Sequence, residues 1–291
     1  MIAAAGRALG RGVERSRRVA GGDINEAWQL ELDDGSPVFL KSRRGAPAEE
    51  FGAEAAGLGW LAEPEGLQVP EVLAIVDEPD ARALALEWIE PGYLSGEGEE
   101  ELGRGLAVVH RAGAPGFGVL PPGSPRRMLR FGGVTIPLDA VPEGSDWAVH
   151  YATRLELLAA SAVGDGRIDS ATADAIAAVC VRMDELAGPE EPPARVHGDL
   201  WSGNVHAGAD GRPWLIDPAA HGAHREIDLA MLRLFGTISR RTLDAYEDVL
   251  PLAAGHEDRV ALWQLQPLLV HAILFGGSYG ASAGRAARLY L

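Results

Sequence analysis

Two short apolar runs, each followed by a polar loop, constrain the fold of this chain more than any other feature. The runs lie around Val196 and at 215–216, and their residues suit short buried strands. Asp199, Asn204 and Asp217 then fall where the chain leaves the predicted strands. The simplest interpretation is a pair of turns between buried strands, since Gly, Asn and Asp favour turns. The alternative is that these polar side chains form a site.

The three polar side chains are the set that phosphoryl transfer from ATP requires. A carboxylate orients the attacking hydroxyl and accepts its proton, and an amide oxygen with a second carboxylate holds Mg²⁺ on the phosphates. The spacing Asp-x-x-x-x-Asn between Asp199 and Asn204 is that of the protein-kinase catalytic loop. Asp217 stands where the metal-binding Asp of the Asp-Phe-Gly motif would be. We therefore favour a kinase-like site with Asp199 as the base.

The region before residue 42 has the pattern of a glycine turn followed by a β-hairpin. Residues 27–32 alternate apolar and polar, a turn follows, and an apolar run ends at Lys41. Gly21 and Gly22 could let backbone amides approach phosphate oxygens, with Asn25 close behind, although most Gly-Gly pairs are only turns. Lys41 is placed as the lysine that neutralises the phosphates of ATP.

A helix predicted over 48–62 offers a carboxylate partner for this lysine. Its apolar positions recur at helical spacing, and Glu50 and Glu54 lie one turn apart. Either could reach Lys41, whereas Glu49 is expected to be solvated. Helix propensity and spacing leave this choice open.

Two more strands, over 69–76 and 82–89, complete a predicted five-stranded antiparallel sheet with one helix. The backbone of Glu87, Trp88 and Ile89 is the expected adenine-binding connection between an N-terminal lobe (residues 1–90) and a C-terminal lobe (residues 91–291). Beyond it the expected elements are mainly helices, at the following places: from 97, at 147–162, at 168–186, up to 235, and two or three more before the end. Residues 113–145, rich in Gly and Pro, are expected to be a loop beside the acceptor site.

Composition excludes several classes of protein. The net charge of −16 repels phosphate backbones and anionic lipid, so neither a nucleic acid nor a membrane is an expected partner. The single Cys180 is expected in the core, and no secretory signal or membrane span is recognised. The expected location is therefore the cytoplasm. His221 and His224 have no partner ligands at useful spacing, so a zinc site is not expected.

The segment His197-Gly198-Asp199-Leu200-Trp201-Ser202-Gly203-Asn204 resembles the signature of the fructosamine kinase family, also called ketosamine-3-kinases. The wider group of phosphotransferases often keeps only His-Gly-Asp and the later Asn, so the intervening Leu-Trp-Ser-Gly makes the resemblance specific. Other segments that resemble the family extend over nearly the whole chain: 21–27, Phe51 with 54–58, 216–219, 225–231 and 274–277.

This resemblance implies an α+β, protein-kinase-like fold of two lobes, with a small antiparallel sheet and one helix in the first and mainly helices in the second. It implies ATP-dependent phosphorylation, with Mg²⁺, of the sugar 3-hydroxyl of a ketosamine, free or protein-bound, in a deglycation role. By the same resemblance Asp199 is the catalytic base, Asn204 and Asp217 hold magnesium, and Lys41 with Glu54 orients the phosphates. Asp228 would hold the backbone of the catalytic loop.

The acceptor side is less determined by the resemblance. Trp201 would face the sugar or its linker and His271 would line the same pocket, although Trp201 could equally pack in the core. Asp23 stands where many relatives carry Cys, so regulation through a thiol there is not expected. Residues 137–139 depart from the family's pattern, which leaves the acceptor open. Two alternatives remain: a small-molecule kinase of the aminoglycoside or choline type, and a nucleotide-binding pseudokinase. Monomer and dimer are both compatible with the sequence.

Overall fold

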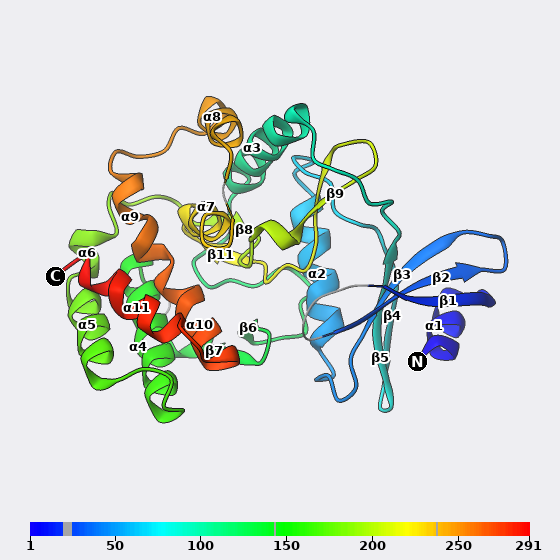
Figure 1. Cartoon of the computed structure of the whole chain (residues 1–291), viewed down its shortest axis with the longest axis horizontal. Coiled ribbons are helices and arrows are strands. Elements are labelled where there is room, and N and C mark those ends of the chain that lie inside the picture. The colour runs from blue at the N-terminus through cyan, green and yellow to red at the C-terminus, as the bar shows by residue number, and fades with distance from the viewer. Residues whose placement is uncertain (20–24, 143, 237) are drawn as a thin grey trace.

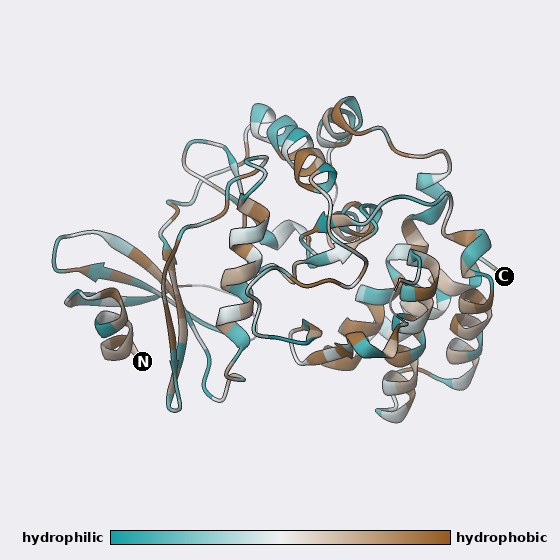
Figure 2. Cartoon of the chain, turned by 180° about the vertical axis from the view of Figure 1, so that it is seen from behind, coloured by the Kyte–Doolittle hydropathy of each residue, from teal (hydrophilic) through white to brown (hydrophobic). Residues whose placement is uncertain are grey.

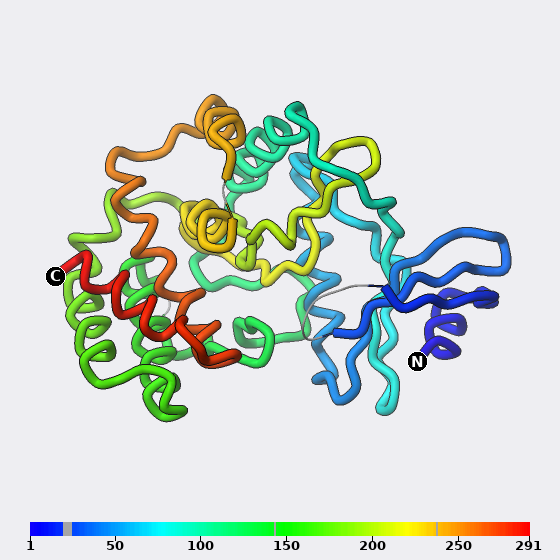
Figure 3. Tube along the Cα trace, viewed as in Figure 1, coloured from blue at the N-terminus to red at the C-terminus, as the bar shows by residue number. Residues whose placement is uncertain are grey.

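The computed structural model of the protein describes residues 1–19, 25–142, 144–236 and 238–291. An antiparallel sheet lies at one end of the molecule and a larger, mainly helical part lies at the other (Figure 1), and the chain passes from the first to the second after β5 (Figure 3). The predicted α+β class, with a small sheet lobe and a larger helical lobe, is confirmed. The division after residue 90 stays a prediction.

Five antiparallel strands form the sheet of the small lobe, as predicted. The strand order is β1-β2-β3-β5-β4, and every neighbouring pair is antiparallel. The strands are β1 (Val13–Val19), β2 (Glu26–Leu32), β3 (Pro37–Ser42), β4 (Val72–Glu78) and β5 (Ala81–Glu87).

Helices cover both faces of this sheet, on opposite sides of it in Figure 1. Successive side chains of a strand point to opposite faces. In β3, Leu40 therefore packs with α1 (Ile2–Leu9), and Phe39 packs with α2 (Glu50–Ala62). Lys41, two residues after Phe39, faces α2 as well, which explains how the strand presents its lysine to that helix. The sequence pattern does not predict α1.

Among the described residues, the larger lobe contains the remaining helices, three short antiparallel strand pairs and two 3₁₀ turns. Its helices are α3 (Gly96–Arg111), α4 (Trp147–Gly164), α5 (Ser170–Val181), α6 (Met183–Leu186), α7 (Glu226–Leu232), α8 (Arg240–Val249), α9 (His256–Trp263), α10 (Leu265–Phe275) and α11 (Tyr279–Arg288). Its strands are β6 (Met128–Phe131), β7 (Val134–Pro137), β8 (Ala194–Val196), β9 (Val205–Ala207), β10 (Pro213–Leu215) and β11 (His221–Ala223), with 3₁₀ turns at Leu138–Ala140 and Ser202–Asn204.

Local chemistry sets several helix boundaries. Side-chain oxygens of Ser95, Asp146, Asp169 and Ser239 accept N–H groups of the first turns of α3, α4, α5 and α8. The helices of the larger lobe carry both hydrophobic and hydrophilic stretches (Figure 2). Most of them bury the hydrophobic stretches in one large cluster, whereas α3 and α8 pack in a second cluster around Leu106 and Tyr246. None of the helices among the described residues is long and apolar enough to cross a membrane.

Three predictions about the larger lobe are wrong in detail. The helix expected over 168–186 is two helices, because the backbone at Arg182 (φ −104°, ψ 14°) leaves the helical conformation. The described chain after Phe235 forms four helices rather than two or three. The loop expected over 113–145 contains the hairpin β6–β7, whose Leu129 and Ile136 are buried in the core.

A buried histidine makes the stability of the larger lobe depend on pH. Nδ1–H of His221 donates to the carbonyl of Ala219 (2.8 Å), and Nε2 accepts from Nη1 of the buried Arg154 (3.0 Å). Burial, and then the positive charge of Arg154, lower the pKa of His221 to about 3. Protonation of His221 is therefore unfavourable in the folded protein.

We expect the free energy of unfolding to fall as the pH drops from about 6.5 toward 4, because the unfolded chain then binds a proton that the folded chain cannot. His221→Gln keeps a donor and an acceptor but does not titrate. The unfolding free energy of this variant, measured by urea denaturation, should change less with pH than that of the wild type. The slope over this range should be smaller by up to about 1.4 kcal/mol per pH unit. Parallel pH curves for the variant and the wild type would contradict this role of His221.

Candidate active site

A buried carboxylate holds the backbone of residues 197–204, the predicted catalytic loop. Asp228, in the first turn of α7, accepts the backbone N–H groups of His197 (2.7 Å) and Gly198 (2.9 Å). Nε2 of His110, from α3, lies 3.2 Å from the same carboxylate, and Nδ1 of that ring contacts the hydroxyl of Tyr246 (2.8 Å). Burial by itself would raise the pKa of Asp228, but the contact with His110 holds it below its ordinary value. The predicted structural role of Asp228 is confirmed.

The catalytic loop also contacts the loop that carries Asp217. Nε2–H of His197 donates to the carbonyl of Ile216 (2.9 Å), and Nδ1 of the same ring faces the backbone N–H of Asp199 (3.3 Å). Gly198 has φ +82°, and a Cβ there would come within 2.3 Å of the carbonyl oxygen of Ala219. Only glycine fits this approach, so the two loops are packed at a fixed separation.

The residues predicted from sequence converge at these two loops. Nζ of Lys41 lies 2.9 Å from Oε2 of Glu54 and 2.7 Å from Oδ1 of Asp217. Nδ2 of Asn204 donates to the backbone carbonyl of Asp199 (2.8 Å). The pairing of Lys41 with Glu54 is confirmed, and Asp217 joins the same network.

The site carries more negative than positive side-chain charge. Burial, and then the negative charges of Asp217 and Asp228, raise the pKa of Asp199 to about 6. Burial would lower the pKa of Lys41, but its two carboxylate partners hold it above its ordinary value, so the lysine is protonated. Glu54, Asp199 and Asp217 together carry more negative charge than Lys41 offsets, which favours a bound cation.

Two oxygens at this site are suited to a divalent cation. Asn204 uses its amide nitrogen toward Asp199, which leaves its side-chain oxygen available. The Asp217 side chain is 36% exposed, and its backbone is left-handed at φ +57°. Carboxylate and amide oxygens are the ligands that Mg²⁺ prefers. The residue set therefore fits the ion that the sequence predicts.

A cavity of about 420 Å³ opens beside Asp199. Trp201 lines it and is 38% exposed, and its ring lies 6.2 Å from that of Phe235. His271 lines it too, 4.7 Å from the same phenyl ring. Nδ1–H of His271 donates to the carbonyl of Pro267 (2.8 Å), and burial lowers the pKa of this ring, so its Nε2 is a hydrogen-bond acceptor. Trp201 is thus not a core residue.

The nucleotide side is only partly within the described chain. Asn25 lines the cavity. Gly21, Gly22 and Asp23 lie outside the described residues, so their predicted roles stay predictions. Glu87 ends β5, and the following Trp88 and Ile89 are half-buried outside any helix or strand. The backbone of these residues is where the connection between the lobes was expected, and adenine binding there stays a prediction.

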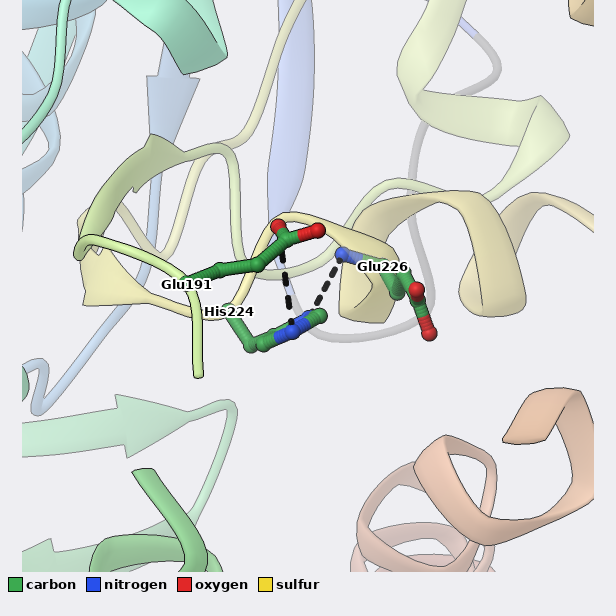
Figure 4. A group of neighbouring side chains, drawn as sticks. All are labelled: Glu191, His224 and Glu226. Carbon is green, nitrogen blue, oxygen red and sulfur yellow. Dashed lines mark hydrogen bonds and ion pairs between the residues drawn. The ribbon is translucent and has the colours of Figure 1, made fainter. Parts of the chain in front are cut away.

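A second group of ligand-type side chains surrounds His224 (Figure 4). Its Nε2 lies 3.8 Å from Oε2 of Glu191, and its Nδ1 faces the backbone N–H of Glu226 at 3.3 Å. The spacing in the sequence did not reveal this group, because Glu191 comes from a distant part of the chain. Arg225 binds the Glu191 carboxylate (2.6 Å) and Arg259 binds that of Glu226 (2.6 Å). These ion pairs leave no net negative charge to attract a metal.

Comparisons with known proteins give the family of this chain. A model described as fructosamine kinase matches residues 3–291. The chain belongs to the fructosamine kinase family. It is 32% identical over 264 residues to the Probable ketoamine kinase of Enterococcus faecium, with 90% of each chain covered. A solved Thermobifida fusca structure, assigned as a fructosamine-3-kinase, shares 39% identity and a TM-score of 0.87, with 99% of this chain and 96% of that chain covered.

Membership of the fructosamine kinase family makes this chain a kinase and confirms the resemblance seen in its motifs. The protein-kinase-like fold is shared more widely. The macrolide 2'-phosphotransferase of Brachybacterium faecium has a TM-score of 0.61 at 16% identity, covering 97% of this chain and 95% of that chain. Similarity at that level shows the fold alone.

The sequence patterns did not predict several of the residues that line the cavity. Phe275 lies in the 274–277 segment that resembles the family, so a signal for it was present. No local signal pointed to the others, because each belongs to an element that the tertiary fold brings to the cavity. They are Phe131, Tyr151, Phe235 and Tyr279.

Proposed function

We propose that the protein transfers the γ-phosphoryl group of ATP to the 3-hydroxyl of a ketosamine, free or attached to a protein amine. One observation carries the proposal: the half-buried carboxylate of Asp199 lines an aromatic-walled cavity that can hold a sugar, and Asp217, which is paired with Lys41, lines the same cavity. Cavities of this size hold small ligands, with a few polar groups that set orientation. Family membership supports the ketosamine as acceptor.

In the proposed reaction the 3-hydroxyl oxygen attacks the γ-phosphorus while the bond from that phosphorus to the bridging oxygen of ADP breaks. The hydroxyl proton passes to Asp199, whose raised pKa makes it a better base than an exposed carboxylate. Lys41, oriented by Glu54, neutralises phosphate charge. Asn204 and Asp217 would hold Mg²⁺, which supplies charge stabilisation at the phosphates. A phosphate at C3 makes the sugar–amine adduct labile, so the proposed role is deglycation.

The composition of the cavity wall argues against a polycationic acceptor. Within the part of the chain that the structure describes, the acidic residues that line it are Asp199 and Asp217, and both already have proposed roles at the phosphate side. An aminoglycoside carries several ammonium groups, which need more carboxylates than these. A ketosamine carries one amine beside its sugar, and aromatic rings such as those of Trp201 and Phe235 pack well against both. The intact set of Lys41, Asp199, Asn204 and Asp217 argues against a pseudokinase.

The direct test is phosphate transfer from labelled ATP to ribulosyl-lysine, fructosyl-lysine and kanamycin. We expect transfer to a ketosamine, and Asp199→Asn should lower turnover roughly 10²–10⁴-fold because it removes the base. Binding of MgATP to the variant, measured by calorimetry, should change little. Transfer to kanamycin alone would overturn the substrate but keep the catalytic residues, and near-full activity of Asp199→Asn would remove that residue from its role.

The metal assignment is tested separately with Asp217→Asn. Asparagine tolerates the left-handed backbone at this position, so the variant removes charge without adding strain. We expect its affinity for MgATP to fall by about tenfold or more, since a metal ligand is lost. Affinity for ATP without magnesium, measured by the same calorimetry, should not fall. Equal affinity of variant and wild type for MgATP would contradict the assignment.

The role of Trp201 as a wall of the acceptor site predicts a selective effect. Trp201→Ala should raise the KM for the acceptor by about tenfold, because stacking of an aromatic ring contributes on the order of 1 kcal/mol beyond the buried area. The KM for ATP should stay unchanged, and Trp201→Phe should recover most of the acceptor affinity. A rise in both KM values would instead indicate a general loss of structure in the catalytic loop.

A further inference from the structure

Glu50 binds three arginines from two parts of the molecule. It is the first residue of α2, and its side chain is 11% exposed. Its carboxylate lies 2.9 Å from Nη2 of Arg43, 2.9 Å from Nη2 of Arg126 and 3.3 Å from Nε of Arg130. Arg43 follows β3 directly, whereas Arg126 lies just before the β6–β7 hairpin and Arg130 lies in β6. One carboxylate therefore joins the small lobe to that hairpin.

On one side, Glu50 connects to the phosphate-binding residues. Glu54 lies one helical turn further along α2, so the two carboxylates are on the same helix face. Glu54 binds Lys41 (2.9 Å), and Arg43 is only two residues after that lysine. A change in the position of α2 at Glu50 would therefore change the position of Glu54 relative to Lys41.

On the other side, Glu50 connects to the wall of the acceptor cavity. Nε of Arg130 also donates to the carbonyl of Gly132 (2.8 Å), in the turn of the hairpin. Phe131 and Gly132 both line the cavity with Asp199. Arg130, one of the three arginines that bind Glu50, thus belongs to the hairpin that shapes the space for the acceptor.

Close packing of α2 makes this connection sensitive to small movements. A Cβ at Gly52 would come 3.3 Å from Cγ of Pro125, next to Arg126, and one at Gly57 would come 3.2 Å from Cγ of Pro218, next to Asp217. The helix therefore lies directly against both segments of the larger lobe. In close-packed contacts of this kind a displacement is transmitted rather than absorbed.

We propose that Glu50 is a positioning residue that couples the Lys41–Glu54 pair at the phosphates to the β6–β7 wall of the acceptor cavity. The inference rests on the proposed function for the identity of the acceptor, but the nucleotide side can be measured without it. Three guanidinium groups surround this one carboxylate. If Glu50 loses its charge, the positive charges of these arginines repel one another without compensation, and this repulsion separates α2 from the hairpin.

The test compares Glu50→Gln with Glu49→Gln, its exposed neighbour on the same turn. Glu50→Gln keeps the shape and removes the charge. We expect kcat/KM to fall roughly 10–100-fold, with higher KM values for both ATP and the acceptor, because a displacement of about 1 Å can cost this much. Glu49→Gln should match the wild type. Circular dichroism and urea denaturation establish that each variant is folded.

A second pair of variants separates the two sides. Arg126→Gln removes a contact to the hairpin segment only, so it should raise the acceptor KM more than the ATP KM, whereas the exposed Arg127→Gln should change neither. The effects of Glu50→Gln and Arg126→Gln should be less than additive when combined, since both break one contact. This pair keeps the inference testable even if Glu50→Gln does not fold.

The inference fails if Glu50→Gln is folded and has wild-type KM values, or if it loses stability while the kinetics of the folded protein are unchanged. If no ketosamine is phosphorylated, the proposed function fails, and calorimetry with MgATP then decides the inference alone. Weaker nucleotide binding by Glu50→Gln than by Glu49→Gln, by about fivefold or more, would support the coupling. Equal affinities would overturn it.

Discussion

The site depends first on the Asp228 carboxylate and the N–H groups that it accepts. Removed from water, a carboxylate is stable only when hydrogen bonds satisfy it. Asp228 obtains them from the backbone at His197 and Gly198 and is approached by His110. The same contacts fix the backbone that carries Asp199. The need to pair one buried charge therefore positions the loop on which the proposed chemistry takes place.

A second constraint is the position of α2 between the lobes. The alternation of β3 points Lys41 at this helix, and the helix supplies Glu54 to it. The same helix contacts the loop after Asp217 through Gly57 and the β6–β7 segment through Gly52 and Glu50. The residues proposed to bind the phosphates and those proposed to bind the acceptor thus both contact one rigid element. Such an arrangement suits a reaction that needs two substrates at a fixed separation.

The acceptor cavity differs in character from the phosphate side. The phosphate side is dominated by charge, with carboxylates around one lysine. The cavity wall is rich in aromatic rings, including those of Trp201, Phe235 and His271. Aromatic faces bind a sugar ring and a single amine without the cost of desolvating further charges. This contrast is the structural basis for preferring a ketosamine over a polycationic acceptor.

Local sequence patterns predicted the parts of the molecule that short-range physics controls. Neighbouring residues determine the alternation of apolar and polar side chains in β2 and β3, the spacing of Asp199 and Asn204, and the helix that carries Glu54. The structure contains these strands, the contact between Asp199 and Asn204, and the contact between Glu54 and Lys41. The sequence pattern does not predict the helix α1, because eight residues are too few to form a stable helix alone. It depends on burial of Ala4 and Ala5 against the sheet.

The fold class, the family and the residues proposed for catalysis follow from the sequence alone, because short motifs with specific spacing carry them. Only the tertiary structure decided which aromatic rings line the cavity, that Glu191 lies beside His224, and that Glu50 binds three arginines. These contacts join residues far apart in the chain. Their geometry depends on how whole elements pack, and no local pattern encodes that packing.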